Sequence, residues 1–258
     1  MNDKLNIALL QSSLVWEDPE TNRRQFSKKL NLVSNDTDLA ILPEMFTSGF
    51  TMSPENLGKG ESEKTVDWMV NEAINRNMAL VGSVVFYEND KYYNRLLFVK
   101  PNGEVSSYNK RHTFTLAGEH KKYTSGKSIE IIEYKGFKIN PLICYDLRFP
   151  VWSRNTDDYD ILVYVANWPK PRITAWDALL KARAIENMAY CVGVNRIGKD
   201  EKGLEYDGHS AVYDPLGEKQ AFSDKEEIIE TTISKAYVDE VRSKLRFLED
   251  RDDFNLKY

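Results

Sequence analysis

The sequence has little of what marks several common protein classes. Its two cysteines, Cys144 and Cys191, are too few for a disulfide framework, which predicts free thiols in a reducing compartment. Its longest apolar stretches, Met78–Tyr87 and Ile161–Trp168, fall short of the roughly 20 residues that cross a membrane. The N-terminal stretch Leu5–Leu10 is too short and too weakly charged at its flank for a signal peptide. These absences predict a cytoplasmic protein with no membrane partner.

A basic surface and an internal linker are also lacking. The 258 residues carry 35 Lys and Arg against 40 Asp and Glu, a net charge of −5, and the pI is about 5.4. No nucleic-acid partner is expected, because neutralising phosphates requires a basic surface. Hydrophobic residues make up 41% of the chain, enough for a core, and no Pro/Gly/Ser-rich stretch divides it. We expect a single domain over residues 1–258, with a C-terminal tail from about residue 237.

Short apolar runs alternate with longer amphipathic segments, a pattern typical of an α/β fold with a sheet buried under helices. The predicted strands are Leu5–Leu10, Leu39–Leu42, Ala79–Phe86, Leu96–Lys100, Phe137–Cys144, Ile161–Ala166 and Tyr190–Asn195. The predicted helices are Thr21–Val33, Glu61–Asn75 and Arg172–Met188.

A short pattern occurs twice. Pro101–Glu104 and Pro215–Glu218 share the spacing P-x-G-E, 114 residues apart. Proline followed two places later by glycine suits a tight hairpin turn. The two copies are either unrelated common turns or the mark of two similar halves. In the second case each half supplies a sheet, and the sheets stack with helices outside.

Cys144 is the candidate nucleophile. It ends the mostly apolar run Ile139–Ile143 and precedes the segment Tyr145–Pro150. A thiol at the end of a buried strand that enters a turn can gain exposure and a lowered pKa. The alternative is an inert buried cysteine. Cys191 has no charged neighbour within two positions and is predicted to be of that inert kind.

Glu44 is the candidate general base. It lies among apolar residues, with Ala40–Pro43 before it and Met45 and Phe46 after it. Burying a carboxylate is costly unless it is paired or its pKa is raised, and a raised pKa suits a base that works near neutral pH. A solvated loop glutamate fits these neighbours poorly. Lys110 and Glu119, each taken alone, have the character of solvated surface residues.

Taken in order, three segments resemble the motifs of the nitrilase, or carbon–nitrogen hydrolase, superfamily: Leu42–Phe46, Tyr108–His112 and Cys144–Pro150. The resemblance runs from Leu5 to about Ser234. Further segments resemble the bacterial omega-amidase branch of that superfamily: Glu44–Phe50, Arg148–Arg154 and Asn167–Arg172. Trp176 and Arg183–Asn187 fit the helix pattern of the family.

The resemblance implies a four-layer α-β-β-α sandwich and a catalytic triad of Glu44, Lys110 and Cys144, with Glu119 as the second glutamate. It implies that Lys110 and the backbone N–H of Tyr145 stabilise the oxyanion. The implied reaction is hydrolysis of the terminal amide of 2-oxoglutaramate or 2-oxosuccinamate to the carboxylate and ammonia, through a cysteine thioester. The alternative substrate is another small carboxylated amide, either deaminated glutathione or an N-carbamoyl amino acid. No metal or cofactor is expected.

An omega-amidase substrate carries a carboxylate opposite its amide, and holding that group requires a fixed cation. Arg148, four residues beyond Cys144, is the first candidate, and Arg172 is the second. Asn167 and Trp168 precede Arg172 and are expected to contact the substrate with it. Alternatively, Arg148 pairs with Asp146 or Glu44 and shapes the loop.

The resemblance also implies a homodimer that pairs through a helix after the nucleophile, at about Phe149–Asn155. Trp152 is then either an interface anchor or a core residue. The tail Tyr237–Tyr258 is charged, and its Phe247, Leu248 and Phe254 are possible docking points.

Other functions are less consistent with the residues. A Cys-His hydrolase would use His112, His120 or His209 as base. A serine hydrolase fails because Gly208–Val212 lacks the final glycine of the nucleophile elbow. A phosphate loop fails at Gly58–Thr65, and the three histidines and two cysteines lack metal-ligand spacing. A non-catalytic interaction module would require Cys144 to be unreactive.

Overall fold

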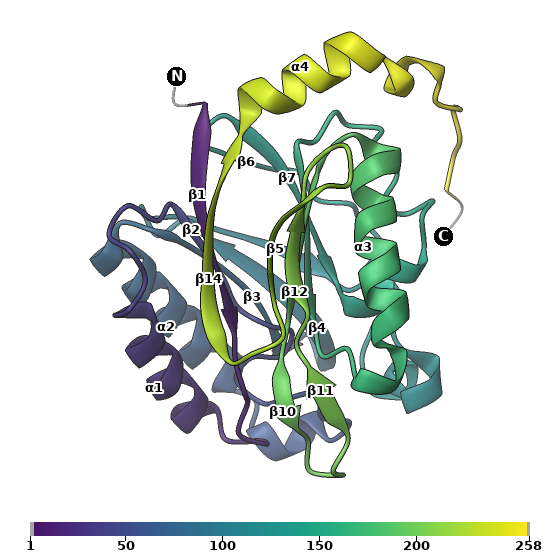
Figure 1. Cartoon of the computed structure of the whole chain (residues 1–258). Helices are drawn as coiled ribbons and strands as arrows, with labels where there is room; N and C mark the ends of the chain where they lie inside the picture. Colours follow the sequence, from purple (N-terminus) through teal and green to yellow (C-terminus); the bar gives the residue numbers. More distant parts are fainter. Residues whose placement is uncertain (1–2, 257–258) are drawn as a thin grey trace.

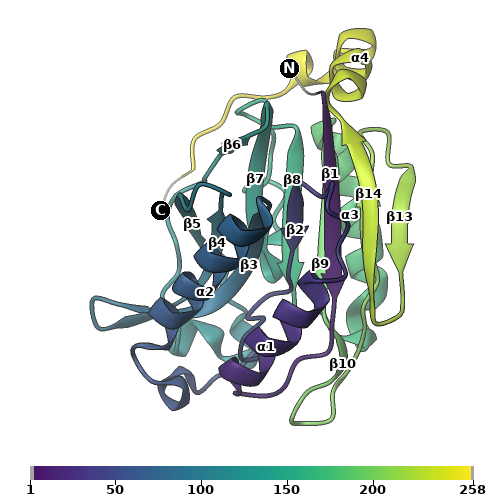
Figure 2. The same ribbon diagram turned by 90° about the vertical axis from the view of Figure 1, so that its left-hand side faces the viewer.

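The computed structural model describes residues 3–256 and contains two stacked six-stranded sheets with helices on their outer faces (Figures 1 and 2). The predicted α-β-β-α sandwich is confirmed. Met1 and Asn2, where the N-terminal segment begins, and Lys257 and Tyr258, where the tail ends, lie outside the described residues. Within the described part, every helix is too short or too polar to cross a bilayer.

The first sheet has the strand order β14-β1-β2-β3-β4-β5. Its strands are β1 (Lys4–Gln11), β2 (Leu39–Ile41), β3 (Ala79–Glu88), β4 (Lys91–Val99), β5 (Val105–Asn109) and β14 (Glu227–Ser234). The three strands β1, β2 and β3 are parallel, and the others pair antiparallel. Helices α1 (Pro19–Leu30) and α2 (Glu61–Arg76) cover the outer face (Figure 2).

The second sheet has the order β13-β12-β9-β8-β7-β6. Its strands are β6 (Ile132–Tyr134), β7 (Phe137–Ile143), β8 (Ile161–Ala166), β9 (Tyr190–Asn195), β12 (Ser210–Tyr213) and β13 (Lys219–Ser223). Helix α3 (Ile173–Asn187) covers its outer face (Figure 1). A separate hairpin, β10 (Ile197–Lys199) with β11 (Glu205–Asp207), leaves the end of β9, and α4 (Lys235–Leu245) follows β14 at one end of the molecule.

The two sheets have the same topology. Three parallel strands are followed by two antiparallel ones, as β1-β2-β3-β4-β5 in one sheet and β7-β8-β9-β12-β13 in the other. The turns that follow β4 and β12 are alike: Gly103 N–H donates to the Lys100 carbonyl at 2.9 Å, and Gly217 N–H donates to the Asp214 carbonyl at 2.8 Å. Both glycines have positive φ, 84° and 81°. The interpretation of the repeated pattern as two similar halves is confirmed.

The alternation of side chains along the central strands builds two cores. In β1, Leu5, Ile7 and Leu9 lie in the core between the sheets, whereas Ala8 and Leu10 lie in the core beneath α1 and α2. Successive side chains of a strand point to opposite faces, and a parallel strand covered on both faces is apolar on both. The continuous apolar runs in the sequence therefore form the interior strands.

Local chemistry decides several element boundaries. α1 begins at Pro19, two residues before the predicted Thr21, because the Asp18 side chain caps it by accepting from Thr21 N–H at 3.0 Å. β4 begins at Lys91, five residues before the predicted Leu96. β7 ends at Ile143, so Cys144 lies outside the strand that was predicted to contain it.

The helix predicted at about Phe149–Asn155 is absent from the described structure. A 3-10 turn over Cys144–Arg148 ends there, and residues 150–153 form further turns. Phe149 has φ −116° and ψ 86°, outside the helical region, and a following proline disfavours helical geometry at the residue before it, so Pro150 stops the helical path. Trp152 is buried within its own chain, so of its two possible roles the core role is confirmed.

Candidate active site

The candidate site lies where the ends of strands from both sheets meet. Glu44 follows β2, Lys110 follows β5, Cys144 follows β7 and Asn167 follows β8. The carboxyl ends of parallel strands meet at the same edge of a sheet, and the loops after them converge. The structure brings Glu44, Lys110, Glu119 and Cys144 together at this point, as the resemblance implied.

Lys110 lies between two buried glutamates. Its Nζ is 2.8 Å from Glu44 Oε1 and 3.0 Å from Glu119 Oε2, and all three side chains are at most 1% exposed. Burial by itself lowers the pKa of Lys110, but the charges of Glu119 and Glu44 outweigh it, so the pKa is raised. Burial raises the pKa of Glu119, against the opposing effect of Lys110. Lys110 is therefore held as an ammonium ion.

Asn94 joins the two carboxylates and was missed by sequence reasoning. Its Nδ2 donates to Glu44 Oε1 at 2.7 Å and to Glu119 Oε1 at 3.1 Å. The Ser83 hydroxyl donates to Asn94 Oδ1 at 2.9 Å, which fixes the orientation of the amide. The signal in the sequence was a polar residue two positions before the apolar run that ends β4, but the partners of Asn94 lie 25 and 50 residues away.

Cys144 begins the 3-10 turn with a left-handed backbone, φ 44°, which is rare for a side-chain-bearing residue and common at functional sites. The residue is only 8% exposed, and Sγ lies 4.0 Å from the Asn167 carbonyl oxygen. Burial, followed by the charge of Glu44, raises the pKa of the thiol well above its usual range, although Lys110 acts in the opposite direction. The expected exposure and lowered pKa are therefore wrong. The thiol keeps its proton until a base removes it.

Asn167 holds Glu44 in place. Its backbone N–H donates to Glu44 Oε2 at 2.8 Å, and its side-chain Nδ2 donates to the Glu44 carbonyl oxygen at 2.6 Å. Trp168, the next residue, is fixed by its own backbone N–H, which donates to Asn195 Oδ1, and by its indole N–H, which donates to the Arg172 carbonyl oxygen. Hydrogen bonds thus hold the loop after β8 in place around the site.

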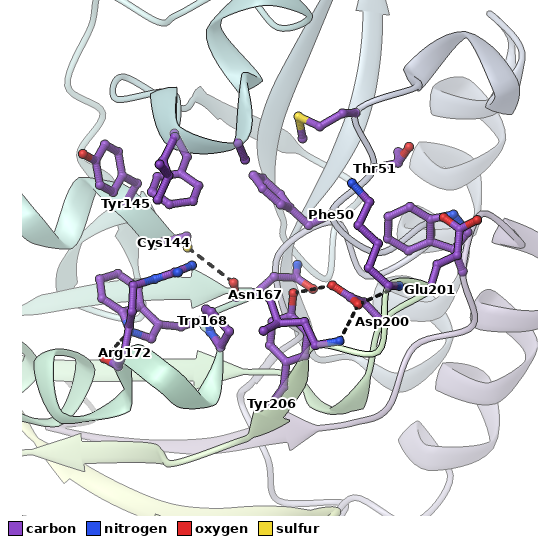
Figure 3. Close-up of a pocket in the computed structure, with 18 of the residues that line it drawn as sticks. Phe50, Thr51, Cys144, Tyr145, Asn167, Trp168, Arg172, Asp200, Glu201 and Tyr206 are labelled. Carbon is purple, nitrogen blue, oxygen red and sulfur yellow. Dashed lines mark hydrogen bonds between the residues drawn. The ribbon is translucent and has the colours of Figure 1, made fainter.

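A cavity of about 520 Å³ opens beside the thiol. Cys144, Asn167, Trp168 and both predicted arginines, Arg148 and Arg172, line it. In Figure 3, Cys144, Trp168 and Arg172 lie toward one side of the view, and the tip of the β10–β11 hairpin, at Asp200 and Glu201, lies toward the other. The backbone of Tyr145 follows Cys144 in the same turn.

The two arginines are held by aromatic rings. The Arg148 guanidinium lies 4.9 Å from the centre of the Trp168 ring, and that of Arg172 lies 5.1 Å from the centre of the Phe114 ring. Within residues 3–256 neither arginine forms an ion pair with a carboxylate, so the alternative that Arg148 pairs with Asp146 or Glu44 is wrong. Both cations are available to an anion in the cavity.

The remaining candidate residues lie elsewhere. Cys191 is fully buried in β9 and has no disulfide partner, as predicted. His209 pairs with Asp177 at 3.0 Å, His112 pairs with Asp146 at 2.8 Å, and His120 is exposed. In the part of the chain that the structure describes, none of the three histidines hydrogen-bonds to Cys144.

The sequence profile of the carbon–nitrogen hydrolase family matches residues 6–243. The chain belongs to the carbon–nitrogen hydrolase family. This carbon–nitrogen hydrolase is 45% identical over 254 residues to the omega-amidase YafV of Escherichia coli K12, covering 98% of each chain. It is 31% identical over 253 residues to the 2-oxoglutaramate amidase of Bacillus subtilis, covering 96% of this chain and 97% of that one.

Solved structures agree with the fold. The CN-hydrolase superfamily protein XC1258 of Xanthomonas campestris, which carries an arsenic adduct in its active site, is 40% identical to this carbon–nitrogen hydrolase. The two superimpose with a TM-score of 0.96 over 98% of this chain and 99% of that one. Nit3 of Saccharomyces cerevisiae, at 24% identity, shares the fold with a TM-score of 0.84 over 94% of each chain.

Proposed function

We propose that this carbon–nitrogen hydrolase is an omega-amidase that hydrolyses the terminal amide of small 2-oxo acid amides, 2-oxoglutaramate and 2-oxosuccinamate. The observation that carries the proposal is a buried Glu44–Lys110–Glu119 cluster beside the Cys144 thiol. The thiol lines a cavity that also contains two arginines, and neither has a carboxylate partner among residues 3–256. The relatives named omega-amidase and 2-oxoglutaramate amidase support the choice of substrate.

In the first step the Cys144 sulfur attacks the amide carbonyl carbon and its proton passes to Glu44. A thiol whose pKa is raised by burial needs such a base, and the Glu44 carboxylate acts directly on the pKa of this thiol. The Lys110 ammonium and the backbone N–H of Tyr145 stabilise the oxyanion. Glu44 then returns the proton to the nitrogen, and the carbon–nitrogen bond breaks. Ammonia is released, and the acyl group remains on Cys144 as a thioester.

In the second step water hydrolyses the thioester. Glu44 takes a proton from the water, and the hydroxide attacks the carbonyl carbon with the oxyanion again beside Lys110. The carbon–sulfur bond breaks, the proton returns to the sulfur, and the carboxylic acid product leaves. Glu119 contributes by holding Lys110, to which both of its oxygens are hydrogen-bonded.

The carboxylate at the other end of the substrate requires a cation within the cavity. Arg148 ends the turn that starts with Cys144, and Arg172 follows the loop that holds Glu44. A planar guanidinium binds a carboxylate through two parallel hydrogen bonds. We assign this role to Arg148 first and to Arg172 second, with Asn167 and Trp168 forming the wall between thiol and cation.

We further propose that two copies pair through the segment 149–155 and the tail. Arg251 of the tail donates to the Asn155 carbonyl oxygen at 3.1 Å and pairs with Asp158 at 2.9 Å, so the tail lies against this segment. Val151 is 53% exposed and Phe254 is 40% exposed, which leaves apolar side chains for a second copy. The two free, buried thiols support a cytoplasmic location.

The proposed function is tested by measuring the product acid and the ammonia or amine released from a panel of substrates. The panel contains 2-oxoglutaramate, 2-oxosuccinamate, glutamine, asparagine, deaminated glutathione, N-carbamoyl amino acids and a simple nitrile. We expect the two 2-oxo acid amides to be the best substrates, with no turnover by Cys144→Ala. Preference for deaminated glutathione or for N-carbamoyl amino acids would replace the substrate assignment, and activity on the nitrile alone would contradict an amidase.

A further inference from the structure

Asp146, two residues after Cys144, is a fully buried carboxylate that the reaction steps above do not use. It accepts four hydrogen bonds. Oδ1 accepts from the backbone N–H of His112 at 2.9 Å and lies 2.8 Å from His112 Nδ1. Oδ2 accepts from the Tyr108 hydroxyl at 2.8 Å and from the backbone N–H of Ile143 at 3.1 Å. Among the described residues it has no lysine or arginine partner.

These donors come from the two chain segments that carry the reacting groups. Tyr108 and His112 flank Lys110, two residues before and two residues after it. Ile143 directly precedes Cys144. A single carboxylate therefore joins the segment that carries the candidate oxyanion cation to the segment that carries the candidate nucleophile.

The arrangement requires a carboxylate rather than an amide. Each oxygen of Asp146 faces a backbone N–H, which can only donate. An asparagine would place its NH₂ group against one of these N–H groups in either orientation. Tyr108 is also fully engaged, because its hydroxyl accepts from Trp152 Nε1 at 3.0 Å and from Arg111 N–H at 3.1 Å while donating to Asp146.

His112 presents one particular nitrogen to Asp146. Its ring stacks on Phe149 with centroids 3.7 Å apart and planes within 7°, which holds Nδ1 toward the carboxylate. Because a carboxylate oxygen can only accept, His112 Nδ1 carries a proton and donates it to Asp146 Oδ1. The histidine thus supplies a directed donor to Asp146.

We propose that Asp146 and His112 are positioning residues: the His112 Nδ1–H···Asp146 hydrogen bond sets the place of Lys110 relative to Cys144. The inference rests on the proposed thiol-amidase function. A displacement on the order of 1 Å between a catalytic group and the reacting atoms can reduce a rate about 100-fold, so such a tie acts on turnover.

The test is a matched pair of variants, His112→Asn and His112→Gln. The amide nitrogen of asparagine can occupy the place of Nδ1, whereas that of glutamine reaches the place of Nε2. Both variants lose the imidazole ring that stacks on Phe149. We expect His112→Gln to lower kcat by roughly 10- to 100-fold, the effect of removing a hydrogen bond to a charged group. We expect His112→Asn to keep most of the wild-type kcat.

Turnover is divided by the number of reactive thiols, titrated with iodoacetamide in a Cys191→Ser background, and thermal midpoints are measured in parallel. A purely structural histidine would change the midpoint and the number of active sites but not kcat per titrated thiol. Equal kcat values per thiol in the two variants would overturn the proposal. Wild-type protein that hydrolyses none of the amides would instead overturn the proposed function, so the two failures are distinguishable.

A second variant tests the carboxylate itself. We expect Asp146→Asn to lower kcat per titrated thiol more than His112→Gln does, because it sets a donor against a backbone donor. Tyr108→Phe, which removes one donor and leaves the others, is expected to have a smaller effect. An Asp146→Asn protein that turns over like the wild type would overturn the role assigned to Asp146.

Discussion

Lys110 is the shared partner of two buried carboxylates, and its charge acts on the thiol beside them. Such a cluster works as a unit, because each member sets the charge state or the position of the others. We therefore predict that Cys144→Ala, Lys110→Ala and Glu44→Gln each lower kcat on the order of 10³-fold or more, and that double variants lose little beyond the single ones. Glu119→Ala should reduce kcat as well, through loss of its hold on Lys110.

The measurement is steady-state turnover of 2-oxoglutaramate, with circular dichroism to check the fold. Lys110→Ala leaves two carboxylates buried without their cation, so its thermal midpoint should fall most, because breaking a buried pair costs about 3–5 kcal/mol. A double variant whose loss equals the product of the single losses would contradict a concerted unit.

The pH dependence of thiol alkylation follows from the charges around Cys144. Glu44 raises the pKa of the thiol and Lys110 lowers it. We predict that Glu44→Gln moves the midpoint of the alkylation rate of Cys144 to lower pH, and that Lys110→Ala moves it to higher pH. The rates are measured with iodoacetamide across the alkaline range, with a Cys191→Ser background to isolate one thiol. Shifts of the same sign in both variants would contradict the electrostatic account.

Substrate selectivity distinguishes the two arginines of the cavity as candidates for binding the substrate carboxylate. If Arg148 holds the substrate carboxylate, Arg148→Lys removes a two-point contact and lowers kcat/KM for 2-oxoglutaramate, with a loss of up to roughly 2–5 kcal/mol. Amides without a carboxylate should be unaffected, and Cys144 should still react with iodoacetamide. If Arg148→Lys still prefers amides that carry a carboxylate whereas Arg172→Lys does not, Arg172 is the residue that holds the substrate carboxylate. If both variants keep the preference for amides that carry a carboxylate, neither arginine holds the substrate carboxylate.

At the scale of elements, the sequence predicted interior strands better than edges. β8 and β9 begin and end at the predicted residues because their side chains are apolar on both faces. The first half of β4 was missed because Asn94 and Arg95 make polar contacts there, one of them in the site. Short edge strands such as β6 and β13 have too little apolar pattern to be recognised.

Site residues that lie in a recognisable sequence motif could be predicted. Residues that reach the site only through contacts made in the folded structure could not. Glu44, Lys110 and Cys144 lie in segments whose residue types resemble family motifs. Asn94 and Asp146 act through partners 25 to 50 residues away, which no local pattern reveals. The pKa direction of Cys144 was also beyond the sequence, because it depends on how deeply the turn is buried.

Helix α3 packs tightly against β9 because Gly193 has no side chain. A Cβ atom there would lie 2.5 Å from Leu180 Cδ1 and 2.7 Å from Trp176 Cζ2, both fully buried. We predict that Gly193→Ala destabilises the fold by about 1–3 kcal/mol, the usual effect of overpacking a core. The control is Gly60→Ala, where a Cβ atom meets nothing within 4 Å. Urea unfolding measures the free energy of unfolding of both variants. Equal midpoints would show that the α3–β9 contact accommodates the added methyl group without loss of stability.

At the scale of the whole molecule, the candidate site joins the two similar halves. Glu44 follows β2 and Asn167 follows β8, the second parallel strand of each half. The loops that follow these equivalent strands are bound to each other by two hydrogen bonds between Asn167 and Glu44. The proposed base and the proposed oxyanion cation come from the first half and the candidate nucleophile from the second, so these groups meet only when the two sheets are stacked. Stability of the sandwich and activity are therefore coupled.

Apolar side chains lie exposed where the C-terminal tail meets the segment 149–155. The tail, held by Arg251, brings Leu256 beside Phe149 and Val151, and Val151 and Phe254 remain exposed there. Because exposed apolar side chains grouped on one surface favour association, we predict a dimer at micromolar concentration that Val151→Asp dissociates.

Sedimentation velocity measures the oligomeric state of the wild type and of Val151→Asp, with Leu32→Asp as the matched control. Leu32 is 76% exposed just after α1, so a charge there should leave the dimer intact. The positioning network reaches the same surface, since His112, Trp152 and Leu256 line one small pocket there. Dissociation by Val151→Asp should therefore also lower kcat, and more so than Leu32→Asp does. A wild-type protein that sediments as a stable monomer would remove both the interface and this link to turnover.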